Sequence, residues 1–409
     1  MARQPVAVML ASERTGGIAP EAPFDTTKLD QLLEQHGFDV ALLTSGHNVR
    51  YMLGGYQNFN FGTMTAIGVS RYLPIVIYWR GRPEDTTLIA RGDEKVVIAG
   101  HEKEHGPLWM PKIITGSYTT EDAVRLASEE LRRHGLSNER VGIEMAFMPY
   151  GAGKLFAEAF PQAEFSDVNR PMERLRARKS RRELTLLREA SERLADAIVA
   201  TFEKTGPGST KFEIIDTLRR EQTERGLTYQ YSLITVGDSR NRVPSRETWD
   251  AGAIMSIDSA SQYNGYLADL CRMGILGEPD PELKDMLAEV ARIQDVARAP
   301  IRNGVRAGQI YADVEAAMAA SPLSEHLNFI GHGMGLVSHE SPRLTDQGPV
   351  PYPASDVDLP LETGTVLSLE TILIHPRRGF IKLEDTVAVT DDGVEGFGDA
   401  GRGWNRGRS

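Results

Sequence analysis

Four carboxylates and one imidazole on apolar segments constrain this sequence more than any other feature. They are Asp258, Asp269, His332, Glu370 and Glu384. The acids stand in or beside short β-like apolar runs, and the histidine stands in a glycine-rich turn. A buried carboxylate without a partner is unfavourable because it loses its hydration, so these acids need a neutralising group. The set therefore predicts a cation site, and its oxygen-rich donors with one nitrogen suit Mn, Fe, Co or Zn.

The length and charge of the chain limit its architecture and its partners. With 409 residues it exceeds one ordinary hydrophobic core, so two domains are expected. Its 46 basic and 57 acidic residues give a net charge of −11, which argues against a nucleic acid as partner. No stretch reaches the ~18–20 consecutive apolar residues of a membrane span. The single cysteine, Cys271, rules out an intrachain disulfide and fits a reducing cytoplasm, where we expect the protein.

The first part of the chain alternates helical and strand patterns. Residues 1–25 are rich in Pro, Gly and Ala and are predicted to form an arm. Apolar spacing predicts a helix from Thr27, a strand over 40–44 and a turn over 45–48. Further segments follow: strands at 73–79, 87–90 and 140–144, and a helix at 120–134. This alternation predicts an α/β domain over 26–168.

The second part, 169–409, is predicted to be α+β. It opens with a segment, 174–182, that has six basic residues in nine and is interpreted as a solvated linker, with a polyanion contact as the alternative. Helical periodicity and apolar alternation then predict two sets of elements. They are helices at 181–204, 211–225, 281–302 and 310–318, and strand pairs at 253–258 with 266–275 and 365–374 with 380–390.

The order of the five residues resembles the dinuclear metal site of the pita-bread superfamily, which includes methionine aminopeptidase, prolidase, aminopeptidase P and creatinase. Asp269 follows Asp258 by eleven residues, His332 lies in Gly-His-Gly-Met-Gly, and Glu384 follows Glu370 by fourteen. The segment Asn-Val-Arg-Tyr-Met-Leu-Gly-Gly-Tyr at 48–56 is similar to the opening of the creatinase-type N-terminal domain. The resemblance implies a creatinase-type domain followed by a pita-bread domain, a curved antiparallel sheet flanked by helix pairs.

The resemblance also implies two divalent metal ions and a role for each ligand. Asp269 and Glu384 would bridge the ions, Asp258 would hold one of them, and His332 and Glu370 would hold the other. Two such ions can make a shared water acidic at neutral pH and polarise an amide carbonyl. Glu370 would also shuttle the proton of that water.

Residues outside the ligand set carry further expectations. His339 lies in Ser-His-Glu-Ser-Pro, similar to the family's HExP segment, where the histidine contacts substrate or stabilises the developing oxyanion. The superfamily's peptidases carry another histidine upstream of the first aspartate, and here Ser245 or Asn241 takes its place. Neither titrates near neutrality, so cleavage of Xaa-Pro bonds is questioned. Arg240 and Arg242 in the same loop could bind a substrate carboxylate, or the loop could simply be solvated.

Three other motifs depart from the family pattern. The family's Glu-Pro-Gly at the first glutamate is replaced by Glu370-Thr371-Ile372. Its Arg-Ile-Glu-Asp is replaced by Lys-Leu-Glu-Asp at 382–385, and its Thr-Arg after the second aspartate by Cys271-Arg272. These changes suggest a pocket rebuilt for a small anionic amide or another compact metabolite.

Four functions remain open on the sequence. The leading one is a dinuclear metallohydrolase, Xaa-Pro peptidase-like, that acts on the C–N bond of a dipeptide or a small modified amino acid. The alternatives are a metal-dependent lyase acting on a small osmolyte, a non-catalytic binding module of the same fold, and a metal-free hydrolase like creatinase. The resemblance further implies a homodimer.

Overall fold

The computed structural model describes residues 21–57, 73–346 and 353–408. The chain forms two compact units, the first ending at Leu175 and the second beginning at Arg176. The predicted arm lies mostly outside the described residues, and the domain limits 26–168 and 169–409 stay a prediction. No helix within the described ranges is long and apolar enough to cross a membrane.

The first unit is a mixed α/β sheet with helices. Its six strands lie in the order β4-β3-β2-β1-β5-β6, and β1 is antiparallel to β2 but parallel to β5. The strands are β1 (Val40–Leu43), β2 (Ile75–Trp79), β3 (Arg82–Arg91), β4 (Lys112–Ser117), β5 (Arg140–Ile143) and β6 (Glu164–Asp167). The helices are α1 (Thr26–Gln35), α2 (Gly46–Met52), α4 (Glu94–His105), α5 (Thr120–Arg133), α6 (Tyr150–Ala159) and α7 (Asn169–Ala177), which spans the boundary.

One prediction for this unit is wrong, because the turn expected over 45–48 is the first turn of helix α2. The Ser45 side chain accepts a hydrogen bond from the backbone N–H of Asn48, which caps the helix. The buried carboxylate of Glu144 accepts from the backbone N–H of Ser45, at 2.8 Å, and from the Asn48 side chain, at 2.6 Å. A partner far away in the sequence therefore helps to set where this helix begins.

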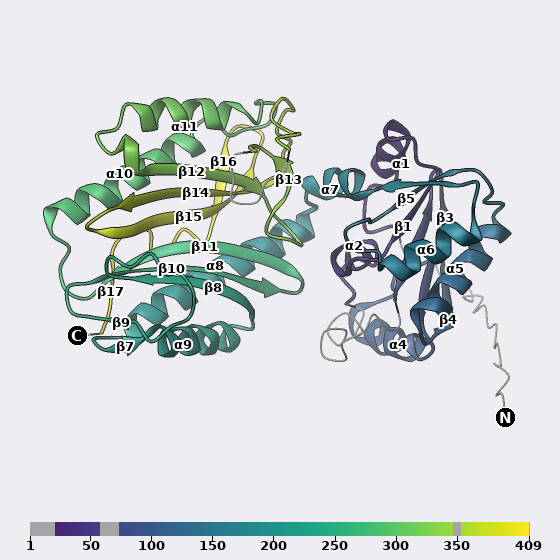
Figure 1. The fold of residues 1–409 in the computed structure, drawn as a ribbon, viewed down its shortest axis with the longest axis horizontal. Coiled ribbons are helices and arrows are strands. Elements are labelled where there is room, and N and C mark those ends of the chain that lie inside the picture. The colour runs from purple at the N-terminus through teal and green to yellow at the C-terminus, as the bar shows by residue number, and fades with distance from the viewer. Residues whose placement is uncertain (1–20, 58–72, 347–352, 409) are drawn as a thin grey trace. The chain divides into compact units, whose positions relative to one another are not determined.

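The second unit is built on a nine-stranded, largely antiparallel sheet, whose long strands lie one above another in Figure 1. Its main path runs β13-β12-β14-β15-β11-β10-β8. The strands are β8 (Thr228–Val236), β10 (Ile254–Tyr263), β11 (Tyr266–Ile275), β12 (Leu327–Gly333), β13 (Glu340–Arg343), β14 (Val366–His375), β15 (Gly379–Val389), β16 (Val394–Phe397) and β17 (Asn405–Arg406). Short strands β7 (Ser209–Thr210) and β9 (Thr248–Trp249) pair separately. Both predicted strand pairs are confirmed as β10 with β11 and β14 with β15.

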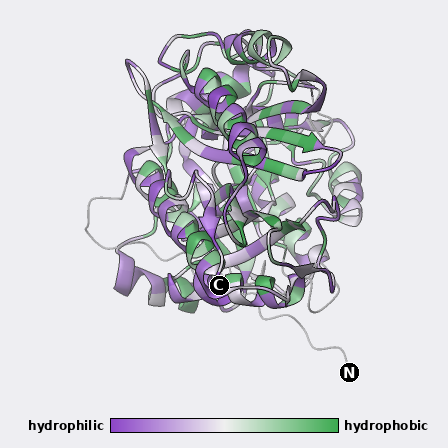
Figure 2. Cartoon of the chain, turned by 90° about the vertical axis from the view of Figure 1, so that its left-hand side faces the viewer, coloured by the Kyte–Doolittle hydropathy of each residue, from purple (hydrophilic) through white to green (hydrophobic). Residues whose placement is uncertain are grey.

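Two helix pairs pack on this sheet, α8 (Arg181–Lys204) with α9 (Lys211–Glu224), and α10 (Pro281–Arg298) with α11 (Gln309–Ala319). A short 3-10 helix spans Ser324–His326. Capping boxes begin α8 and α9, each pairing a hydroxyl cap with a glutamate three residues later. Helix α10 ends at Arg298 instead of the predicted 302, because Pro300 lacks the N–H that a helix needs. Figure 2 shows hydrophilic and hydrophobic residues alternating along the helices, as expected where one face is buried.

The basic segment 174–182 is only partly solvated, so its interpretation as a solvated linker is wrong for two residues. Arg176 and Lys179 are buried, and both contact the buried carboxylate of Glu340. The Arg176 guanidinium lies 3.0 Å from Glu340 Oε2, and Lys179 Nζ lies 2.9 Å from Oε1. We call these three residues the balanced cluster, because each of the three charged side chains has a partner of opposite charge within it.

Candidate metal centre

Five neighbouring strands carry the five predicted ligands on one face of the sheet. Glu370 and Glu384 lie directly opposite each other on β14 and β15. Cys271 on β11 lies opposite both Glu384 and Asp258, and Asp269 lies two residues before Cys271. Side chains that lie opposite each other on paired strands, or two residues apart on one strand, share a face of the sheet. The four acids therefore lie on the same face, one each on β10, β11, β14 and β15.

His332 reaches the same face from β12. It pairs with Ser368, which lies two residues before Glu370 on β14. The glycines around it permit close approach of other chain segments, because a Cβ at Gly333 would collide with the backbone oxygen of Ser341 and one at Gly335 with Glu340. The glycine-rich turn therefore serves packing around the histidine.

The ligand atoms form two groups, each compact enough to hold one ion. Asp258, Asp269 and Glu384 place an oxygen apiece within 4.8 Å of one another, and His332, His339 and Glu370 do the same with nitrogen and oxygen atoms. All five predicted ligands are buried. The structure thus brings together every predicted ligand, and it adds His339 to the group around His332.

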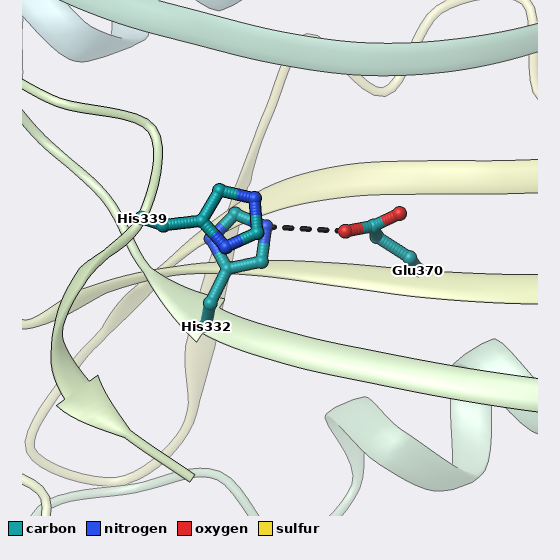
Figure 3. Close-up of side chains that lie close together, drawn as sticks. All are labelled: His332, His339 and Glu370. Carbon is teal, nitrogen blue, oxygen red and sulfur yellow. Dashed lines mark hydrogen bonds and ion pairs between the residues drawn. The ribbon is translucent and has the colours of Figure 1, made fainter. Parts of the chain in front are cut away.

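The two histidines stack on each other beside Glu370 (Figure 3). Their ring centroids are 3.8 Å apart, and His332 Nε2 lies 3.2 Å from Glu370 Oε1. His332 Nδ1 lies 3.2 Å from the carbonyl oxygen of Gly333, a contact that would let a neutral ring keep its Nε2 lone pair for a cation. Burial, with a smaller contribution from His332, lowers the pKa of His339 to about 4, so His339 is neutral at pH 7.

Asp269, Glu370 and Glu384 have shifted pKa values, which reflect burial and the crowding of charged groups. Burial raises the pKa of Asp269 well above its usual range, and the neighbouring acids Glu384 and Asp258 add to this shift. Burial and Glu370 raise the pKa of Glu384 to about 7. Burial also acts to raise the pKa of Glu370, but Lys382 and His332 outweigh it and lower that pKa below its usual value. A divalent ion would favour the charged form of all of them.

A lysine that the sequence reasoning did not assign to the site lies among these acids. Lys382 Nζ is 2.7 Å from Asp258 Oδ2, 2.6 Å from Glu370 Oε2 and 2.7 Å from Glu384 Oε2. Its side chain is 3% exposed. Lys382 lies two residues before Glu384 on β15 and so shares its face. That spacing was the signal that could have found it.

Two further side chains contact the acids. Arg242 forms an ion pair with Asp258, and its guanidinium carbon lies 5.2 Å from the ring centre of Phe380. The hydroxyl of Tyr231 on β8 donates a hydrogen bond to Asp269 Oδ2. We call the five predicted ligands and Lys382 the ligand cluster. Of the two predicted arginines, Arg242 contacts this cluster, whereas Arg240 is exposed. Tyr231 was not predicted, and no motif in the sequence singled it out.

The two candidates for the missing histidine are engaged elsewhere in their loop. The Ser245 hydroxyl donates to Glu247 Oε2 at 2.8 Å, and the Asn241 side chain donates to the same oxygen at 2.8 Å. Lys211 Nζ also lies 3.0 Å from that oxygen. Glu247 thus organises the loop, and a substrate contact of Ser245 stays a prediction.

The donor set fits divalent ions. Asp269 Oδ1 is buried and has no hydrogen-bond partner in the described part of the chain, although such atoms are normally satisfied. Four acids with one or two imidazoles are the donors that Mn, Fe, Co and Zn accept. An ion beside Asp269 would satisfy this oxygen and relieve the repulsion between neighbouring acids.

Comparisons with known proteins agree with this geometry. Residues 185–391 match metallopeptidase family M24, and residues 26–178 match the creatinase/prolidase N-terminal domain. An uncharacterized peptidase of Bacillus subtilis, YqhT, is 26% identical over 375 residues, 90% of this chain and 95% of that protein. A Xaa-Pro dipeptidase of Pyrococcus furiosus is 23% identical over 265 residues, 63% of this chain and 73% of that protein.

A solved structure shows the same fold. The Xaa-Pro dipeptidase from Bacillus anthracis superposes with a TM-score of 0.73 at 22% identity, covering 92% of this chain and 97% of that one. The predicted fold class, a creatinase-type α/β domain followed by an α+β pita-bread domain, is confirmed.

Proposed function

Because this chain belongs to metallopeptidase family M24 and is a metallohydrolase, we propose that it hydrolyses the C–N bond of a dipeptide or a small modified amino acid. The observation that carries this proposal is the convergence of five buried ligands from five strands around an unpartnered aspartate oxygen. The names of the relatives, which include Xaa-Pro dipeptidases, support a dipeptide as the substrate class. A divalent ion, when bound, would polarise the scissile carbonyl and make the attacking water more acidic.

The ligands divide the work of holding that cofactor. Asp258, Asp269 and Glu384 would hold metal from one group of donors, and His332 and Glu370 from the other. Tyr231 donates to Asp269 and Ser368 donates to Glu384 Oε1 at 2.9 Å. Such contacts orient ligands and are worth ~10–100-fold in metal affinity.

Glu370 and His339 are the groups that we assign to proton handling and to the substrate. The charged form of Glu370 is favoured by Lys382 and His332, so it can accept the proton of an attacking water and pass it to the leaving nitrogen. His339, neutral at pH 7, can donate one N–H to the oxygen that develops negative charge. Arg242, beside Asp258, is placed to bind a substrate carboxylate, and Arg240 and Ser245 would contribute at the same loop.

The lack of an upstream histidine bears on whether the protein cleaves Xaa-Pro dipeptides. In Xaa-Pro peptidases that imidazole handles the amide nitrogen, and here the loop offers serine and asparagine already bonded to Glu247. We therefore expect poor turnover of Ala-Pro and Gly-Pro. The same lack favours a lyase as the second candidate, which would release an unsaturated acid instead of an amine.

The proposal is tested by metal content and product. Protein purified without chelator should contain transition metal by elemental analysis, and a dipeptide panel should yield free amine only with metal present. Absence of metal even after reconstitution would move the assignment to a creatinase-like or binding role. An unsaturated acid as product would establish the lyase instead.

Three further properties remain part of this proposal. The single cysteine and the acidic charge fit a cytoplasmic protein. The likeness to creatinase-type proteins suggests a homodimer. The domain limits are proposed as 26–168 and 169–409.

A further inference from the structure

Lys382 lies where a metal ion would be expected to meet its ligands. Its ammonium contacts Asp258, Glu370 and Glu384 at 2.6–2.7 Å. Asp258 and Glu384 belong to one of the two ligand groups and Glu370 to the other. One buried ammonium therefore contacts donors that two ions would otherwise share.

The charge of the cluster supports the same conclusion. When all four carboxylates are ionised, which a bound divalent ion would favour, they carry four negative charges, and the cationic side chains of Lys382 and Arg242 contact them. Two negative charges remain when both bases are counted. One divalent ion completes the neutralisation, whereas a second would leave excess positive charge in a buried site, which is unfavourable.

The donors that Lys382 does not contact indicate where the favoured ion binds. Asp269 Oδ1 is buried without a hydrogen-bond partner, and His332 Nε2 faces Glu370 Oε1, the oxygen of that carboxylate turned away from Lys382. Asp258, by contrast, meets both Lys382 and Arg242. The position that depends on Asp258 is thus the one already filled by positive charge.

We propose that Lys382 is a built-in cation that competes with the second metal ion, so that the chain binds one divalent ion tightly and a second at least about tenfold more weakly. This inference rests on the proposed metal-dependent function and refines it. The tight ion is held by donors that include Asp269 and His332. The second ion binds only when the ammonium leaves Asp258 and Glu384.

The test is a titration of full-length protein with Mn²⁺ alone, after removal of bound metal with a chelator and dialysis. Isothermal calorimetry should show one tight event and a second at least about tenfold weaker for the unmodified chain. Lys382→Met, which keeps most of the length of the unbranched side chain and removes its charge, should bind two ions tightly. Lys382→Arg keeps the charge and should keep the weak second event.

A matched control comes from the first unit. Lys112 pairs with the buried Glu130 at 2.6 Å, so Lys112→Met also removes a lysine from a buried acid but should leave both binding events unchanged. Circular dichroism before titration checks that each variant is folded. If Lys382→Met does not fold, Lys382→Gln removes the same charge and should likewise tighten the second binding event.

Each outcome has one meaning. A weak second ion in the unmodified chain, tightened in Lys382→Met, supports the inference. Two equally tight ions in the unmodified chain, or identical binding in both, overturn it while leaving the proposed function intact. No binding of Mn²⁺ by any of these proteins overturns both.

Discussion

Two of the buried charge clusters in the second unit, the balanced cluster and the ligand cluster, differ in the ratio of acids to bases. In the balanced cluster, Glu340 meets Arg176 and Lys179, and all three side chains are at most 2% exposed. In the ligand cluster, four carboxylates meet Lys382 and Arg242, and Asp269 Oδ1 stays unpartnered. Two adjacent residues belong to different clusters: His339 lies with His332 and Glu370, and Glu340 belongs to the balanced cluster.

This difference separates a structural cluster from a functional one. Each charged side chain of the balanced cluster has a partner of opposite charge, so we expect the cluster to act on stability. The ligand cluster has a surplus of negative charge that the chain leaves uncompensated, which is what a cation site requires. The number of bases per acid is therefore more informative here than the presence of buried acids.

The largest expected effect is that of Asp269→Ala on metal and activity. The change removes a proposed metal ligand, so bound metal and turnover should be lost together, with activity down by at least about 100-fold. Elemental analysis and an amine-release assay on the same preparation check this. Full activity in a preparation that contains no metal would refute the metal-dependent mechanism.

A smaller but selective effect is expected for His339→Ala. Its imidazole is assigned to the substrate, so kcat should fall by ~10²–10⁴-fold while the metal content stays that of the unmodified chain. Stability should change little, because the ring is not part of the balanced cluster. Loss of metal in this variant would instead make His339 a ligand, as its place beside His332 also permits.

The neighbouring change, Glu340→Ala, should act on stability. It leaves Arg176 and Lys179 buried without their acid, which typically costs about 3–5 kcal/mol of unfolding free energy. Urea unfolding measures this loss, and the folded fraction should still bind metal. If stability were unchanged, the balanced cluster would have no structural role and the contrast between the clusters would fail.

The smallest expected effect is the pH dependence of that stability. Burial acts to raise the pKa of Glu340, but Lys179 and Arg176 outweigh it and hold the pKa below its usual value. A lowered pKa in the folded state stabilises the fold above the unfolded value of about 4.3, and this contribution is lost as the pH falls through the folded value.

The unmodified chain and Glu340→Gln should therefore differ by a constant unfolding free energy above about pH 5, and this difference should shrink as the pH falls below the unfolded pKa of about 4.3. Urea unfolding of both proteins from pH 7 to pH 3 tests this. The comparison cancels the titration of the ligand cluster, which both proteins share. A difference that persisted unchanged at pH 3 would contradict the assigned pKa shift.

Much of the fold could be predicted because local patterns agreed with it. Helices α1, α5, α8 and α9 lie within one or two residues of their predicted ranges, since apolar spacing and capping residues are local signals. The turn over 45–48 failed because Glu144, about a hundred residues away, supports a helix start there. The prediction of a solvated linker was wrong for Arg176 and Lys179, because both form buried ion pairs with Glu340.

The sequence by itself singled out the five proposed ligands, because a carboxylate on an apolar strand needs a neutralising partner wherever the strand lies. Only the tertiary structure decided their neighbours. Strand register places Lys382 among three acids, brings Tyr231 to Asp269 and binds Ser245 to Glu247. These partners come from strands and loops far apart in the chain. Electrostatic energy depends on distances in space, which the spacing of residues along the sequence does not give.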